Sequence, residues 1–148
     1  MKQMEKHMTL DELNSKLAEK GIPADRYYLH GRYGSTDDND KIALIIKAGR
    51  YTVQYETYFR ERGEKHSVKV FATESEACEY VYNKLMDEQI FLRIQQIEGL
   101  LGMTVNERLW ASGLMDEFDQ VLKADKASAR KILRWLKVDE ASIEKIVK

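Results

Sequence analysis

The order of apolar and polar residues changes once along this chain, near Met103. Before residue 90, the apolar positions follow helical spacing, then alternate as in β-strands, and then return to helical spacing. After residue 103 they keep helical spacing throughout. The pattern predicts three parts: an α+β domain over residues 1–89, a helical connector over 90–102 and a small helical domain over 103–148.

The first domain is expected to begin and end with a helix. Thr9 and Glu12 have the spacing of a capping box, in which each side chain accepts a hydrogen bond from the other residue's backbone amide. Leucines follow at spacings of three and four residues until Gly21, a residue typical of a helix end. A second capping box over residues 73–76 precedes another apolar stripe. Both helices are expected to pack on one face of a sheet.

Four segments between these helices have strand patterns: residues 26–29, 41–47, 51–58 and 67–71. Val68 and Val70 in the last segment are expected to face inward, because side chains alternate along a strand. Residues 30–40 are rich in Gly and Asp and are typical of a loop. The predicted fold class is α+β: a mainly antiparallel, three- to four-stranded sheet flanked by two helices, followed by an all-helical C-terminal segment.

The C-terminal part has helix signals only. Residues 90–101 are apolar at helical spacing and could continue the preceding helix as a connector. A third capping box, Thr104 and Glu107, begins the helical domain, and Gly113 is a weak point in the helix that follows. Two further short helices are expected, over residues 126–136 and 140–147.

Composition limits the partners that the chain is expected to bind. The chain has 148 residues, 33% of them charged, and a net charge of −1. Residues 1–89 carry a net charge of −2 and the remainder +1, so neither part has the positive balance that favours nucleic-acid binding. The longest apolar run, residues 42–46, is too short to span a membrane. We therefore expect no nucleic-acid partner and no membrane partner.

Cysteine content and the first residues indicate a compartment. The single cysteine, Cys78, excludes an internal disulfide and a site of several thiolates, which favours a reducing compartment. The first eight residues are polar and charged, without the apolar segment of a secretory signal. A cytoplasmic location is the simplest interpretation.

Few residues could support catalysis. His30 and His66 lie at predicted strand ends and could in principle form an acid–base pair of the ribonuclease type. Nothing in their spacing supports such a pair, and ordinary surface histidines are more common than positioned bases. Cys78 falls in an amphipathic helix, where a small buried residue is more usual than a nucleophile, which needs a paired histidine and a cleft. We therefore expect no enzymatic activity and no cofactor.

The acidic run from Asp37 to Asp40 resembles half of a calcium-binding loop. Counted from Asp38, the sixth position is Ala43 rather than Gly and the twelfth is Gly49 rather than Glu. No metal site is therefore expected. The remaining interpretations are a solvated turn and an acidic contact loop that enters a basic cleft, as in the active site of a nuclease.

The tyrosines of the predicted sheet could stack on nucleic-acid bases, but half-buried sheet tyrosines are more common. Five lie in or beside the predicted strands: Tyr27, Tyr28, Tyr51, Tyr55 and Tyr58. The order of elements also invites comparison with the double-stranded RNA-binding domain, which needs a lysine-rich start to its last helix. Here that start, residues 73–76, carries two glutamates, which disfavours this family.

Residues 8–88, and above all the segment ATESEACEYV over 72–81, resemble small bacterial immunity proteins of polymorphic and contact-dependent growth inhibition toxins. Residues 104–119, TVNERLWASGLMDEFD, are similar to a short helical protein type associated with the same gene neighbourhoods. The resemblance implies a stoichiometric inhibitor that binds a cognate toxin domain, of which a nuclease is one candidate, and occludes its active site or substrate path. Contacts differ between toxin pairs, so the family indicates no individual residues.

Charge and predicted exposure suggest which residues would bind a basic toxin. Seven are candidates, in the acidic loop, on the strand face expected to be exposed, and in the following hairpin: Tyr33, Asp37, Asp38, Asp40, Glu56, Glu61 and Glu64. The alternative function is a non-enzymatic adaptor or regulatory module that binds another protein through the C-terminal helices around Trp110 and Trp135. An open sheet edge could also pair with a partner strand.

Overall fold

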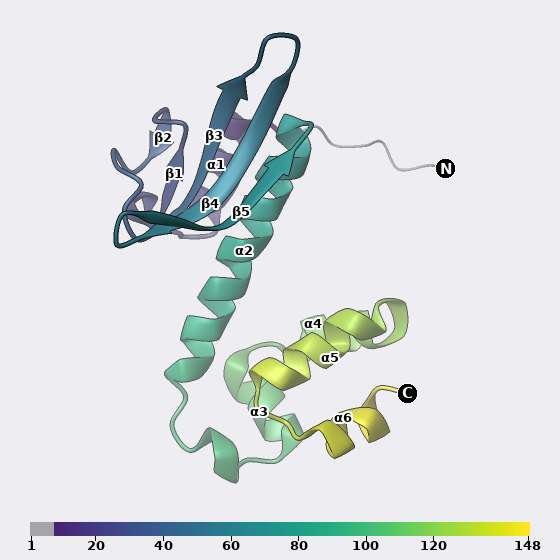
Figure 1. Ribbon diagram of the computed structural model, residues 1–148. Helices are drawn as coiled ribbons and strands as arrows, with labels where there is room; N and C mark the ends of the chain where they lie inside the picture. The colour runs from purple at the N-terminus through teal and green to yellow at the C-terminus, as the bar shows by residue number, and fades with distance from the viewer. Residues whose placement is uncertain (1–7) are drawn as a thin grey trace. The chain divides into compact units, whose positions relative to one another are not determined.

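The computed structural model of the protein describes residues 8–148 (Figure 1). The described chain divides after Asp87 into two compact units, each with its own hydrophobic core. Residues 90–102 belong to the second unit, because Ile94 and Leu100 are buried in its core. No helix in the described range is long and apolar enough to cross a lipid bilayer.

The first unit holds five strands and the helices that cover them. Its elements are α1 (Leu10–Glu19), the 3-10 helix η1 (Ala24–Arg26), β1 (Tyr27–Leu29), β2 (Tyr33–Gly34), β3 (Ile42–Ala48), β4 (Val53–Glu61), β5 (Glu64–Phe71) and the first part of α2 (Glu74–Gln95). The predicted capping box of α1 is confirmed: Thr9 Oγ1 accepts from the Glu12 amide at 3.2 Å, and Glu12 Oε1 accepts from the Thr9 amide at 3.0 Å. Thr73 Oγ1 likewise accepts from the Glu76 amide at the start of α2.

The strand order of the sheet is β2-β1-β3-β4-β5. Three of its four pairings are antiparallel, but β1 and β3 are parallel, so the sheet is mixed. The prediction of three to four strands missed β2, which lies within the segment expected to be a loop. Gly31 and Gly34 have φ angles of +73° and +80°, which allow the chain to turn back so that β2 pairs with one edge of β1. Because that edge is occupied, β3 pairs with the opposite edge of β1.

Both helices pack on the same face of the sheet, as the sequence predicts (Figure 1). Leu13 and Leu17 of α1, Leu44 of β3, and Cys78 and Val81 of α2 are fully buried in one core. We call this side of the sheet the inner face. The opposite side, the outer face, has no helix over it within the described part of the first unit.

The prediction that Val68 and Val70 face inward is wrong, because they are 48% and 53% exposed. Phe71 pairs with Tyr55 and packs against the core, so its neighbour Val70 must point to the outer face. The ladder shifts register between Thr57 and Phe59, and Ser67 in this bulge has a φ of +55°. β5 is also an edge strand, since it pairs with β4 alone.

The second unit is helical. After the end of α2 it contains η2 (Leu100–Gly102), α3 (Val105–Ser112), α4 (Met115–Ala124), α5 (Lys126–Trp135) and α6 (Glu140–Ile146). The predicted weak point at Gly113 is a full break: its φ of +76° ends α3, and α4 follows as a separate helix. The buried residues Leu109, Phe118 and Leu133 come from α3, α4 and α5.

Arg108 connects two segments of the second unit through hydrogen bonds. Its guanidinium donates hydrogen bonds to the carbonyl oxygens of four residues, all outside the regular α-helices: Leu101, Met103, Leu136 and Lys137. Hydrogen bonds from a charged group are stronger than neutral ones. The end of η2 with the residue that follows it, and the segment after α5, are thereby held in fixed positions.

Candidate functional site

A polar network lies on the outer face of the sheet. Register and alternation place Lys47 of β3 on this face, together with Glu56, Tyr58 and Arg60 of β4. Asp38, from the loop before β3, and Lys65, from the start of β5, complete the network through side-chain contacts. The six residues come from three strands and a loop, so only the folded sheet brings them together.

Asp38 binds two neighbours at the end of β4. Its Oδ2 accepts hydrogen bonds from the Tyr58 hydroxyl at 2.5 Å and from Arg60 Nε at 2.9 Å. These bonds, that from Tyr58 first, lower the pKa of the Asp38 carboxyl. Burial, together with the Asp38 carboxylate, raises the pKa of Tyr58 to about 12. At neutral pH this part of the network therefore holds a carboxylate, a neutral phenol and a guanidinium.

Glu56 is buried rather than exposed as the sequence suggested, with 7% of its surface accessible. Its carboxylate accepts hydrogen bonds from Lys65 Nζ at 2.8 Å and from Lys47 Nζ at 3.3 Å. The bond from Lys65 is the main cause that lowers the pKa of Glu56. The Lys65 ammonium also lies 4.5 Å from the centre of the Tyr58 ring. A partner would meet the lysines of this group before it met Glu56.

The acidic loop and the β4–β5 hairpin meet at one end of the sheet. The Asp40 amide donates to the Arg60 carbonyl at 2.8 Å, and Asn39 forms a bridge with Arg60. Glu61 follows Arg60 directly and is paired with Glu64 across the hairpin. Four exposed carboxylates gather there, and we call them the acidic end: Asp37, Asp40, Glu61 and Glu64.

Charge at the acidic end is only partly compensated. Lys41 Nζ lies 3.2 Å from Asp37, whose pKa is lowered first by the Asn39 amide and then by Lys41. No ion pair to Asp40, Glu61 or Glu64 forms among residues 8–148. Like charges directly opposite each other in a ladder destabilise it, so the Glu61–Glu64 pair opposes folding slightly.

The hairpin that carries these glutamates turns through Arg62 and Gly63. Both residues have positive φ, +55° and +79°, as a type I′ turn requires. Such a turn matches the twist of the strands and fixes their register. The register then sets Glu61 opposite Glu64 rather than opposite a lysine.

Tyr33, the remaining predicted site residue, lies elsewhere. It belongs to β2, at the edge of the sheet opposite to β5 (Figure 1). Its hydroxyl donates to Asp11 Oδ1 of α1 at 3.0 Å, so the ring turns toward the helix-covered side. That hydrogen bond is also the main cause of its raised pKa. The structure therefore does not place Tyr33 with the carboxylates of the acidic end.

His30 and His66 do not meet. They lie at β1 and on β5, which are separated by β3 and β4, a distance of about 14 Å at the usual strand spacing. The Nδ1 of His30 accepts a hydrogen bond from the Ile46 amide at 3.0 Å, which extends the pairing of β1 with β3. His30 thus has a local structural role.

Other groups considered from the sequence have structural positions as well. Cys78 is fully buried, and this burial raises the pKa of its thiol to about 12, so the reactive thiolate does not form at neutral pH. Tyr27 is buried, and its hydroxyl donates to Asn14 Oδ1 at 2.9 Å. Tyr51 precedes β4 and is 88% exposed. The tyrosines therefore do not form one stacking surface. Within residues 8–148, no group of three or more His, Cys, Asp or Glu side chains is placed to hold a metal ion.

Sequence reasoning missed the cations of the polar network: Lys47, Arg60 and Lys65. Each looks like an ordinary surface residue, and only the strand register shows that Lys47 and Lys65 flank the same glutamate. The alternation of residues 54–60 was the available signal, since it puts Glu56, Tyr58 and Arg60 on one face. Comparisons of the chain with models of protein families, with curated proteins and with solved structures find no match.

Proposed function

We propose that this protein is an immunity protein, which acts in the cytoplasm by binding a cognate toxin domain and occluding its active site or substrate path. The class is suggested by the resemblance of residues 8–88 to such proteins. It is also suggested by the similarity of residues 104–119 to a short helical protein type associated with the same gene neighbourhoods. The observation that carries the proposal is the acidic end, where carboxylates from two separate segments converge on a rigid sheet.

The charge of the acidic end suits a basic target. A nuclease domain that binds a phosphate backbone presents Lys and Arg side chains in its cleft. Carboxylates fixed on a hairpin and an anchored loop can occupy the positions of those phosphates, and complementary charge also speeds association. The Glu61–Glu64 repulsion would be relieved when partner cations lie between the two side chains.

The first experiment expresses this chain together with the toxin domain encoded beside its gene. Growth rescue and a one-to-one complex of the purified proteins are the expected results. A toxin that still kills, and that does not co-purify with this chain, would refute the immunity role.

Charge-reversal variants locate the binding surface. Glu61→Lys with Glu64→Lys should weaken the toxin complex by at least about tenfold, since partner cations would then meet lysines. The matched control is Glu79→Lys with Glu98→Lys, which changes the net charge equally at exposed positions outside the acidic end. Equal affinities of the two double variants would show that the acidic end is not the contact.

An adaptor that acts through the C-terminal helices is the second candidate. The exposure of Trp110, 79%, favours it, because tryptophan is enriched at the energetic centres of interfaces. If a Trp110→Ala variant still rescues growth from the toxin, toxin binding does not need this helix face, and any adaptor role of Trp110 is a separate one.

A further inference from the structure

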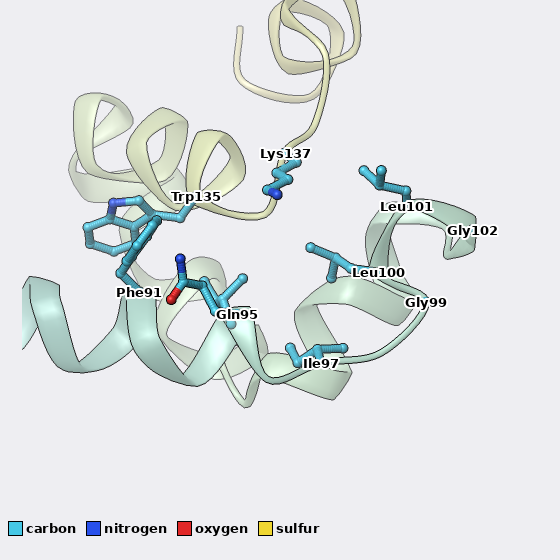
Figure 2. A pocket seen from close by; sticks show the side chains of 10 residues that line it. Phe91, Gln95, Ile97, Gly99, Leu100, Leu101, Gly102, Trp135 and Lys137 are labelled. Carbon is cyan, nitrogen blue, oxygen red and sulfur yellow. The ribbon is translucent and has the colours of Figure 1, made fainter.

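The second unit contains an apolar pocket of about 330 Å³ (Figure 2). Its wall combines the end of α2, the segment up to Gly102, and the end of α5. The apolar side chains that line it are Phe91, Ile94, Ile97, Leu100, Leu101 and Trp135. Its volume is near the lower limit of sites that bind organic ligands, and it is large enough for one big side chain.

Two polar side chains complete the pocket. Lys137 lines it, and its amino group points toward the space between Trp135 and Leu100 (Figure 2). The Gln95 amide points into the same space. Neither side chain has a polar partner among the described residues. The pocket therefore offers a cation and an amide that can both donate to a bound molecule, and the amide can also accept from it.

The position of Lys137 is fixed by its backbone. Its φ of +62° is left-handed, a conformation that glycine adopts with least strain after a helix end. Its carbonyl oxygen accepts a hydrogen bond from Arg108 at 3.0 Å, and its amide donates to the Arg134 carbonyl at 2.9 Å. The lysine side chain thus leaves a restrained point of the backbone, directly beside the pocket.

The rim of the pocket favours a polypeptide over a small molecule. Leu101 is 71% exposed and Phe91 is 45% exposed, so apolar surface continues outside the cavity. A small ligand that fills the cavity would leave this surface in water, whereas a chain segment would cover it. The Gln95 amide also matches the alternating donors and acceptors of a peptide backbone.

We propose that this pocket binds a segment of a partner protein that inserts one large apolar side chain and places an Asp or Glu beside Lys137. All residues that line the pocket belong to the second unit, so docking there does not depend on toxin binding at the acidic end. The apolar anchor supplies affinity, and the carboxylate selects the orientation and register of the segment.

Peptide display on the whole 148-residue chain tests the proposal. The probe is a phage-displayed library of random dodecapeptides, and the selected peptides are then synthesised and titrated. A Trp110→Phe background leaves Trp135 as the single tryptophan, so its fluorescence reports occupation of the pocket. The expected result is enrichment of peptides that combine a large apolar residue with a nearby Asp or Glu, and that saturate the Trp135 signal.

Three variants make the test specific. Leu101→Asp changes an exposed rim residue and should weaken peptide binding by about tenfold. Lys137→Glu should also weaken the binding of acidic peptides by about tenfold, and selection from the library on this variant should enrich basic peptides instead. Lys137→Gly removes the ammonium at a position whose φ suits glycine, so it should fold normally and lose the preference for acidic peptides.

Other outcomes would overturn the proposal. Failure to enrich any peptide, or peptides that bind all three variants as tightly as the parent, would show that the pocket is not a docking site. Saturable quenching of Trp135 by N-acetylphenylalanine without peptide enrichment would identify a small-carboxylate site instead. The toxin rescue assay is read separately, because these variants leave the acidic end unchanged.

Discussion

The polar network and the acidic end adjoin each other, at Arg60 and Glu61 of β4 and across the hairpin in β5, yet they arrange their charges in opposite ways. Asp38 and Glu56 in the network each accept hydrogen bonds from at least one cation, and both have lowered pKa values. Glu61 and Glu64 at the acidic end face each other. The network therefore stabilises the fold, whereas the acidic end opposes it slightly.

Carboxylates that stabilise the fold can thus be distinguished from carboxylates that are available to a partner. A carboxylate that already accepts hydrogen bonds from cations of the same chain can contribute little to binding another molecule. One that lies beside a like charge gains from any cation that arrives. Of the seven residues proposed from the sequence, Glu61 and Glu64 fit the second description, and Asp40 likewise has no ion pair within residues 8–148. Their role in binding stays a prediction.

The largest effect on stability is expected from Asp38→Ala. It removes the acceptor for Arg60 and for the buried Tyr58 hydroxyl, which should lower the free energy of unfolding by about 2 kcal/mol. Urea denaturation measures the loss. In a Tyr58→Phe background the same substitution should cost less, because no hydroxyl is left unsatisfied. Equal losses in both backgrounds would mean that the Asp38–Tyr58 bond contributes nothing.

A smaller loss is expected from Glu56→Gln, which keeps the shape of the side chain and removes its charge. Lys47 is half exposed and can turn to water, so the expected cost is about 1 kcal/mol. Urea denaturation at neutral pH gives the value. A variant as stable as the parent would mean that this buried carboxylate is neutral in its effect on folding.

Acid should weaken the first unit through the same carboxylates. Their native pKa values lie below the ordinary 3.8 of Asp38 and 4.5 of Glu56, so the folded state binds fewer protons than the unfolded state. The stabilisation is fully present above these ordinary values and is lost as the pH falls through the native ones. The urea concentration at the midpoint of unfolding should therefore decrease as the pH is lowered below about 4.5. The fall should be shallower in Glu56→Gln, and identical profiles for parent and variant would contradict this assignment.

The smallest effect, and the one of opposite sign, is expected from Glu61→Lys. It replaces a repulsive cross-strand pair with an attractive one and should stabilise the protein by roughly 0.5 kcal/mol. Thermal unfolding, compared with Glu79→Lys on α2, separates this gain from a general change in net charge. A variant that is more stable but binds toxin less well would be strong support for the proposed site. Destabilisation would show that the Glu61–Glu64 register is not under strain.

The sequence was most informative where signals are local. The capping boxes at Thr9 and Thr104 depend on residues three positions apart, and both are confirmed in the structure. β2 was missed because a two-residue strand has too little pattern to distinguish it from a loop. The inward assignment of Val68 and Val70 failed because alternation alone does not indicate which of the two sets faces the helices.

The candidate site could be predicted only in part for the same reason. Acidic residues near a turn are visible in any sequence, and four of them do gather at one end of the sheet. The burial of Glu56 depends on two lysines from different strands, and the orientation of Tyr33 depends on Asp11 of α1. Such contacts follow from register and topology, which a single sequence specifies weakly.

The bulge at Ser67 has a further consequence, for the behaviour of concentrated solutions. A long, flat edge strand invites other copies of the chain to add to it and to grow into fibrils. In β5 the left-handed residue kinks the strand near its middle, and Lys65 and Lys69 place charge on either side of the kink. An incoming strand would have to follow that bend and accept both lysines. The bulge and these two lysines are therefore expected to hinder pairing of β5 with another copy of the chain.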